Sequence, residues 1–116
     1  MTEVPQVAVA DLPSDPPPGT PGGIVLLDVR EDDEWQAGHA PTAVHVPLGT
    51  LVARLSEVPT DRPVAVVCRS GGRSAQATAY LLAQGVQARN VAGGMTWWQA
   101  RGLPLESDGP AAPRVL

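Results

Sequence analysis

Proline and glycine set the first limit on what this chain can fold into. Thirteen prolines and twelve glycines are spread through 116 residues, and both residue types interrupt regular helices and strands. The densest stretch, residues 13–23, holds five prolines and three glycines, so we expect a loop there. The elements between these interruptions must be short, and a chain of this length has no room for a second independent core.

Two runs of apolar residues have the pattern of buried parallel strands. Residues 24–29 and 63–68 are nearly continuously apolar. They lack the alternation of apolar and polar residues that is typical of a strand with one solvent-exposed face. Shorter strands are expected over 6–10, 43–46 and 89–91. These strands alternate along the chain with segments of helical character.

The helical segments complete an alternating pattern. The acidic residues 31–34 suit the first turn of a helix, where carboxylates favour the positive end of the dipole. Residues 48–57 have apolar positions at helical spacing, residues 73–84 are rich in helix formers and end before Gly85, and 95–101 predicts a last short helix. Strands alternating with helices predict an α/β fold with a small, mainly parallel sheet flanked by helices.

We assign one domain to residues 1–106, with 13–23 as its proline-rich loop. The last ten residues, 107–116, include Gly109, Pro110 and Pro113 and show no periodicity. We therefore expect them to form a disordered C-terminal tail.

Composition excludes several classes of protein. The net charge is −4, with eight arginines and no lysine, which argues against a nucleic-acid binder that coats phosphates. The single cysteine, Cys68, cannot form an internal disulfide or a cysteine-rich zinc cluster, and the two histidines have no metal-ligand spacing. We expect neither a metal nor a cofactor.

Features of a membrane or exported protein are not seen in the sequence. The first residues lack the basic and apolar regions of a signal peptide, and the longest apolar run is far below the ~20 residues of a membrane helix. We therefore expect no membrane partner and a cytoplasmic location, where Cys68 would stay a free thiol.

Cys68 stands where an α/β sheet normally holds its ligand site, at the carboxyl end of a buried strand. The glycines that follow allow successive N–H groups to point into one concavity, and the next helix contributes its free N–H groups. Arg69 and Arg73 add positive charge. Such a loop binds an oxyanion and stabilises a thiolate. The alternative is that Cys68 is a small buried apolar residue, but that role requires neither Gly71-Gly72 nor flanking arginines.

The loop Cys68-Arg69-Ser70-Gly71-Gly72-Arg73-Ser74 resembles the active-site loop of single-domain rhodaneses. The resemblance runs in matching order over residues 7–105. The chain departs from the family's pattern at Thr42, where glycine is usual, and in the proline-rich segment. Three more segments agree with family signatures: Asp28-Val29-Arg30-Glu31 with Glu34-Trp35 and Gly38-His39-Ala40-Pro41; Val46-Pro47-Leu48; and Gly93-Gly94-Met95 with Trp97 or Trp98 and Gly102-Leu103-Pro104.

The resemblance implies a thiosulfate-type sulfurtransferase. Cys68 would be the catalytic nucleophile that takes the outer sulfur of a small anionic donor such as thiosulfate and passes it to cyanide, a thiol or a dithiol, which can belong to a protein. Arg73 would close the loop and Arg69 would lie at its rim. The residues that the resemblance assigns to substrate binding are Arg69, Ser70, Gly71, Gly72, Arg73 and Ser74.

Two other functions remain as alternatives. Rhodanese-like domains also serve as non-catalytic interaction modules or sulfur carriers, although the non-catalytic ones often lack the cysteine that this chain keeps. Related phosphatases and arsenate reductases have a loop one residue longer than the six residues from Cys68 to Arg73, so phosphate chemistry is disfavoured.

Several polar residues near the loop are interpreted as structural. We expect Asp28 and Arg30 to form an ion pair beneath the loop, and His39 to serve a turn. His45 lies on a predicted strand, and we expect it to face away from the core. Trp97 or Trp98 could line an acceptor-binding rim, while at least one of them is expected in the core.

Overall fold

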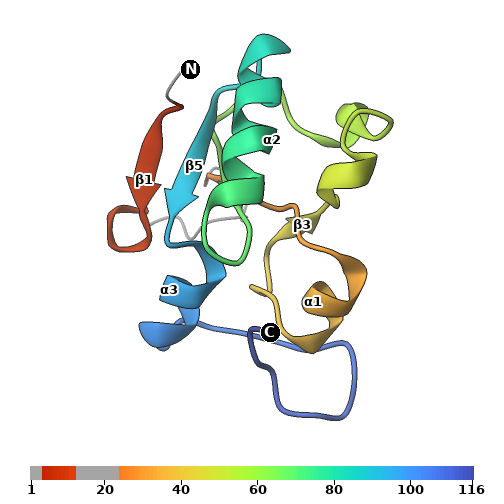
Figure 1. Ribbon diagram of the computed structural model, residues 1–116, viewed down its shortest axis with the longest axis vertical. Helices are drawn as coiled ribbons and strands as arrows, with labels where there is room; N and C mark the ends of the chain where they lie inside the picture. Colours follow the sequence, from red (N-terminus) through yellow and green to blue (C-terminus); the bar gives the residue numbers. More distant parts are fainter. Residues whose placement is uncertain (1–3, 13–23) are drawn as a thin grey trace.

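The computed structural model describes residues 4–12 and 24–116 (Figure 1). Its centre is a five-stranded sheet in the order β1-β5-β4-β2-β3, and every neighbouring pair is parallel. This confirms the predicted α/β fold. The segment 13–23, expected as a loop, lies outside the described residues. The strands are β1 (Gln6–Ala8), β2 (Val25–Asp28), β3 (Val44–His45), β4 (Val64–Val67) and β5 (Ala88–Ala92).

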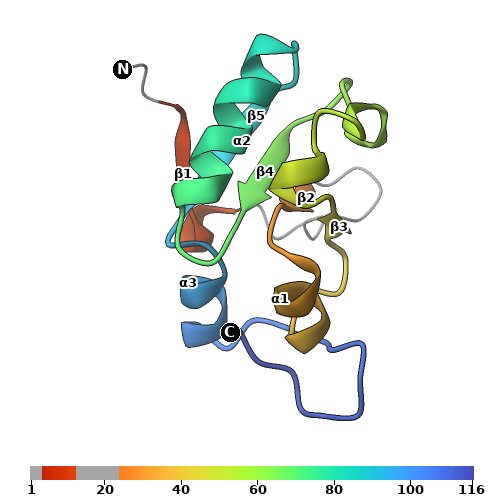
Figure 2. The ribbon, with the colours of Figure 1, turned by 45° about the vertical axis from the view of Figure 1, so that its right-hand side comes forward.

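Helix α2 (Gly72–Ala83) lies against one face of this sheet, and α3 (Gly94–Ala100) and α1 (Asp32–Ala37) lie at its carboxyl end (Figures 1 and 2). Helix α2 packs against β4 and β5, and its Ala77 and Leu81 join the core on that face. Helix α3 contributes Met95 and Trp98 to the core on the other face. Helix α1 follows β2 beyond the end of the strand.

The buried strands explain the continuous apolar runs in the sequence. Side chains of β2 and β4 alternate between the two core clusters: Leu27 and Val66 lie on one face, and Leu26 and Ala65 on the other. Because core side chains pack on both faces of the sheet, every position of these strands is buried. The two apolar runs were therefore correctly interpreted as central parallel strands.

The segment 48–57 differs from the single amphipathic helix expected there. It forms two short 3₁₀ turns, η2 (Leu48–Thr50) and η3 (Leu55–Glu57), joined by turns. Its apolar side chains still pack on the core, because 3₁₀ turns also bring residues three apart to one face. Gly49, Thr50 and Val52 lower the helix propensity of this segment, which leaves its packing on the core to favour the 3₁₀ turns.

Residues 107–116 also differ from the expected disordered tail. They have no regular secondary structure, but their backbone hydrogen-bonds to the end of α1: the Asp108 N–H donates to the Gln36 carbonyl (3.0 Å) and the Arg114 N–H to the Ala37 carbonyl (2.9 Å). The C-terminus lies between α3 and α1 in both ribbon views (Figures 1 and 2). The last carbonyls of a helix lack partners within it, and this segment supplies them.

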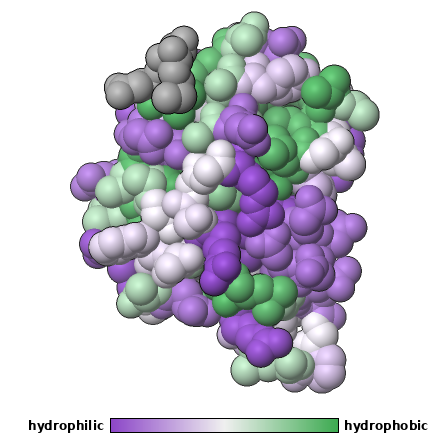
Figure 3. All heavy atoms as spheres, viewed as in Figure 1, coloured by the Kyte–Doolittle hydropathy of each residue, from purple (hydrophilic) through white to green (hydrophobic). Residues whose placement is uncertain are grey.

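On the face shown in Figure 3, hydrophilic side chains alternate with small hydrophobic patches. The large hydrophobic side chains that are exposed among the described residues are Val52, Leu82, Trp97 and Leu116. Within the described part of the chain, every helix is too short or too polar to cross a membrane.

Candidate active site

Cys68 directly follows the central strand β4, and the loop after it leads into α2. The start of α3 holds this loop from the other side, since the Met95 N–H donates to the Cys68 carbonyl (2.9 Å) and the Thr96 N–H to the Arg69 carbonyl (3.0 Å). Gly94 allows this approach: a Cβ there would lie 2.4 Å from the Cys68 carbonyl oxygen. The close backbone contact requires glycine at this position.

The Cys68 thiol is buried, with 1% of the residue exposed, among hydrogen-bonding groups. The Gly71 N–H donates to the Cys68 Sγ (3.1 Å), and the Ser74 hydroxyl lies 3.2 Å from the same sulfur. Gly71 has φ +128°, a conformation that residues with a side chain rarely adopt. Glycine at position 71 therefore allows this N–H to point towards the Cys68 sulfur.

These groups lower the pKa of the Cys68 thiol. Burial raises that pKa, but hydrogen bonding from the Ser74 hydroxyl and from the N–H groups of Ser74, Gly71 and Ser70 outweighs it. The thiolate is the nucleophilic form of cysteine. The site therefore favours a reactive anion at the sulfur.

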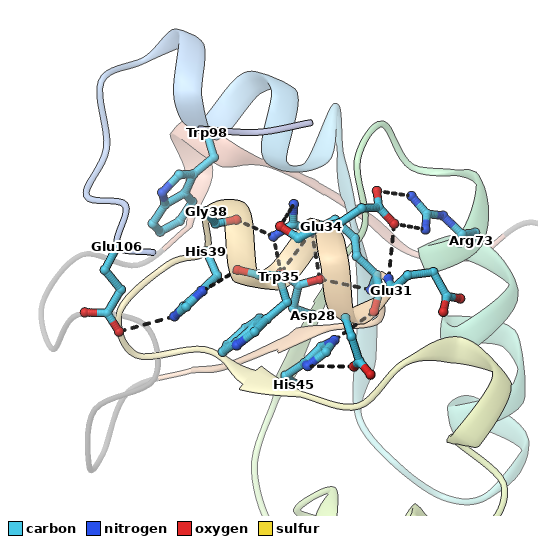
Figure 4. Close-up of polar contacts among 12 residues, drawn as sticks. Asp28, Glu31, Glu34, Trp35, Gly38, His39, His45, Arg73, Trp98 and Glu106 are labelled. Atoms are coloured by element: carbon cyan, nitrogen blue, oxygen red, sulfur yellow. Dashed lines mark hydrogen bonds and ion pairs between the residues drawn. The ribbon is translucent and has the colours of Figure 1, made fainter. Parts of the chain in front are cut away.

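Arg73, which was expected to add positive charge and to close the loop, is paired with a carboxylate. Its guanidinium pairs with the Glu34 carboxylate through two hydrogen bonds, Nη1 to Oε1 and Nη2 to Oε2 (2.8 Å; Figure 4). The bonds to Arg73 lower the Glu34 pKa to about 2 and raise the Arg73 pKa. This pair joins the first turn of α2 to α1, so Glu34 largely neutralises the charge nearest the loop.

The structure brings only part of the predicted loop together around the sulfur. Ser74 is buried and Gly71 points its N–H inward, whereas Arg69, Ser70 and Gly72 are exposed. Ser70 contributes through its backbone N–H. The sulfur is thus surrounded by peptide N–H groups and one hydroxyl rather than by arginine side chains.

Two residues that contact this site were missed in the sequence. Asn90 on β5 accepts a hydrogen bond from the Ser74 hydroxyl and donates one to the Gly71 carbonyl (3.2 Å). Glu34 lies three residues after Glu31, and the two form a capping box at the start of α1. That spacing signals a helix start, but nothing local in the sequence indicates the bonds to Arg73 or Ser74.

Asp28 and Arg30 form the expected ion pair, and both side chains are fully buried. The Arg30 Nε and Nη2 atoms bond the two carboxylate oxygens (3.0 and 2.8 Å). Arg30 Nη2 also donates to the Gly38 carbonyl (2.7 Å) just after α1. The pair is structural as predicted, and it holds the end of α1 to β2.

The two histidines pack on opposite faces of one tryptophan. The Trp35 ring stacks on His39 (centroids 3.7 Å apart) and on His45 (4.5 Å; Figure 4). His45 is partly buried outside the two core clusters, and its Nε2 donates to the Arg30 carbonyl (2.8 Å). In the described residues, no cluster of three or more His, Cys, Asp or Glu side chains is suited to a metal.

Comparison with known proteins relates this arrangement to a family. A sequence model described as the rhodanese-like domain matches residues 18–101. A sulfurtransferase of Allochromatium vinosum is 42% identical over 83 residues, which cover 71% of this chain and 78% of that protein. The thiosulfate sulfurtransferase GlpE of Pseudomonas savastanoi pv. phaseolicola is 37% identical, covering 67% and 74%. The crystal structure of a rhodanese-related protein from Thermoplasma volcanium has a TM-score of 0.78 at 28% identity, covering 88% and 97%.

Proposed function

This chain belongs to the rhodanese-like domain family, and we propose that it is a sulfurtransferase that moves a sulfane sulfur from a donor such as thiosulfate to a thiophilic acceptor. The observation that carries the proposal is the buried Cys68 sulfur, which faces the Gly71 N–H and the Ser74 hydroxyl. These groups favour an anionic sulfur, both as thiolate and as persulfide.

In the first step the Cys68 thiolate attacks the outer sulfur of thiosulfate. A sulfur–sulfur bond forms at Cys68 while the sulfur–sulfur bond of thiosulfate breaks, and sulfite leaves with the bonding electron pair. The enzyme then holds an anionic persulfide. The inward N–H groups of the loop stabilise its outer sulfur as they stabilise the thiolate.

In the second step an acceptor attacks the outer sulfur of the persulfide. Cyanide becomes thiocyanate, and a thiolate becomes a persulfide. In each case the electron pair of the breaking bond returns to Cys68 and restores the thiolate. One cysteine suffices for this cycle, which accords with the single cysteine of the chain. A physiological acceptor is a thiol or dithiol, which can be part of a protein, and a reducing cytoplasm would keep Cys68 free.

Thiosulfate is the favoured donor class for two reasons. A cradle of peptide N–H groups at a helix start suits a small anion, and the GlpE relative carries thiosulfate sulfurtransferase in its name. The six-residue loop from Cys68 to Arg73 is short for a tetrahedral phosphoryl group. Hydrolysis of an aryl phosphate at a rate comparable to sulfur transfer would contradict this assignment.

The test is a two-stage measurement on the whole chain. Incubation with thiosulfate, followed by intact mass spectrometry, should show a mass increase of one sulfur atom, and added cyanide should remove it with release of thiocyanate. Cys68→Ser is the control and should show neither. A wild-type protein without the adduct would sink the proposal. An adduct that small acceptors fail to remove would favour the alternative, a sulfur carrier that delivers to a partner protein.

A further inference from the structure

Asn90 is a buried residue at the midpoint of β5, with 4% of the residue exposed. In the register of the sheet it pairs with Val66 of β4 on one side and with Gln6 of β1 on the other. Val66 and Cys68 lie two residues apart on the same face of β4. The Asn90 side chain therefore points to the face on which the cysteine loop and the start of α2 lie.

The hydrogen bonds of Asn90 determine which way its amide is oriented. Its Nδ2 donates to the Gly71 carbonyl (3.2 Å) and to the Gln6 Oε1 (3.0 Å). A peptide carbonyl can only accept, so the NH₂ group must face Gly71 and the Oδ1 must face Ser74. The Ser74 hydroxyl donates to that Oδ1.

This orientation determines the bond between Ser74 and Cys68. A hydroxyl has one proton, and in Ser74 that proton is directed to Asn90. The oxygen therefore presents a lone pair to the Cys68 Sγ, 3.2 Å away, and the bond is made by the neutral thiol donating its S–H to Ser74. The chain of donors runs from Cys68 to Ser74 to Asn90.

A change in charge at the sulfur breaks this order. Once the thiol has lost its proton to water, or has become a persulfide, the sulfur can only accept a hydrogen bond. Two acceptors, the anionic sulfur and the Asn90 Oδ1, then compete for the single proton of Ser74. Stabilising the anion requires the hydroxyl to turn from Asn90 to the sulfur.

We propose that Asn90 is a positioning residue that acts on Cys68 through Ser74, holding the hydroxyl proton while the sulfur is neutral and yielding it when the sulfur becomes anionic. Asn90 also anchors the Gly71 carbonyl, and the N–H of the same residue donates to the sulfur. The inference deepens the proposed function and rests on Cys68 as its nucleophile. It assigns to a strand residue outside the loop an influence on how readily the thiolate forms.

The test is a double-mutant cycle on the pKa of the thiol. Asn90→Leu keeps the approximate size of the side chain and has two opposite effects on the thiol pKa. It removes the competing acceptor and frees the Ser74 proton for the sulfur, which lowers the pKa. It also removes the hydrogen bond to the Gly71 carbonyl, which raises the pKa. In a Ser74→Ala background only the second effect remains. The pKa is obtained from the rate of iodoacetamide alkylation against pH, read by intact mass.

In each background we compare the thiol pKa with and without Asn90→Leu. The pKa difference caused by Asn90→Leu should be more negative by about 0.5 to 1 pH unit when Ser74 is present than in the Ser74→Ala background, which is the size of one modest hydrogen bond. Equal changes in the two backgrounds, or a higher value with Ser74 present, would overturn the proposal. Gln87→Leu is the matched control: it also replaces a side-chain amide by leucine, but at an exposed site next to β5, and should leave the thiol pKa unchanged.

Two features keep the outcome decisive. If Asn90→Leu does not fold, judged by circular dichroism, Asn90→Ala removes the same acceptor without placing a branched side chain in the core, and the same cycle applies. Alkylation needs no sulfur donor. If the cycle shows the coupling but the wild-type chain forms no persulfide, the proposed function is contradicted while the role of Asn90 stays supported.

Discussion

Arg73 and Glu34 form a bidentate salt bridge that links the start of α2 to α1, although the two residues are 39 positions apart in the sequence. α1 is anchored in turn by Arg30, whose guanidinium bonds the Gly38 carbonyl and the buried Asp28 carboxylate. The cysteine loop is thus closed by a salt bridge that rests on a second, buried salt bridge. The position of the loop depends on α1 as well as on the strand that carries Cys68.

The ion pair should contribute to stability in a pH-dependent way. The Glu34 pKa falls from 4.5 to about 2 in the folded protein, so its contribution is present above about pH 4.5 and is lost as the pH falls towards 2. Glu34→Gln should lower the free energy of unfolding by about 1 kcal/mol at neutral pH, as for a charge-assisted hydrogen bond at a partly exposed site. The difference from wild type should shrink near pH 3, measured by urea denaturation.

Glu57 provides the matched control for that experiment. It pairs with Arg54 three residues earlier on an exposed turn, where solvent screens the charges. Glu57→Gln should therefore change stability much less than Glu34→Gln at neutral pH. Equal effects of the two substitutions, or a Glu34→Gln effect that is the same at both pH values, would show that the loop is not held by this pair.

Removing the hydroxyl of Ser74 should make the Cys68 thiolate less stable relative to the neutral thiol. The pKa of the Cys68 thiol lies below its usual value even though burial raises it, because the Ser74 hydroxyl and the N–H groups of the loop outweigh burial. Ser74→Ala should raise that pKa by about 0.5 to 1 pH unit, and the alkylation rate should reach its plateau at higher pH. Ser70→Ala, which keeps the contributing N–H, should leave the profile in place; a shift as large as that of Ser74→Ala would contradict the assignment.

Gly71 and Gly72 should respond differently to the same substitution. Gly71 has φ +128°, whereas Gly72 begins α2 with open space around its Cβ position. Gly71→Ala should cost about 1–3 kcal/mol through backbone strain and slow persulfide formation by moving the N–H away from the sulfur. Gly72→Ala should be neutral or slightly stabilising. Denaturation curves and single-turnover persulfide formation distinguish them, and equal costs would refute this account of the loop.

Cys68→Ser should abolish sulfur transfer and leave the fold intact. Serine is similar in size to cysteine, and the N–H of Gly71 and the hydroxyl of Ser74 can bond an oxygen as they bond sulfur. The unfolding temperature should stay within a few degrees of wild type while thiocyanate production disappears. Loss of folding in this variant would indicate that Cys68 serves mainly as a core residue.

Deleting residues 107–116 should destabilise the protein. Their backbone N–H groups bond the Gln36 and Ala37 carbonyls, Val115 packs on a core cluster, and the Arg114 backbone lies so close to Gly38 that a Cβ there would be 2.2 Å from the Arg114 carbonyl oxygen. We expect a lower urea midpoint and faster proteolysis near α1. An unchanged midpoint would restore the expectation of a disordered tail.

Local patterns accounted for most of the secondary structure and for the position of the nucleophile. The apolar runs 24–29 and 63–68 are buried on both faces, so their composition alone reports their environment. Gly71, three residues after Cys68, is needed for a local backbone conformation, which neighbouring residues in the sequence can indicate. The same is true of the helix that begins after this loop and ends before Gly85.

Local patterns could not predict two kinds of feature: which of two conformations of similar energy a segment adopts, and which residues far apart in the sequence are in contact. Residues 48–57 satisfy their apolar spacing in 3₁₀ turns as well as in a helix, and packing on the core decides between them. Glu34 with Arg73 and Asn90 with Ser74 meet only because the parallel sheet brings β2, β4 and β5 side by side. The order of residues along the chain is enough to specify an α/β domain of short elements with one thiol after a strand. Which groups surround that thiol depends on the folded arrangement, because hydrogen bonds form between neighbours in space.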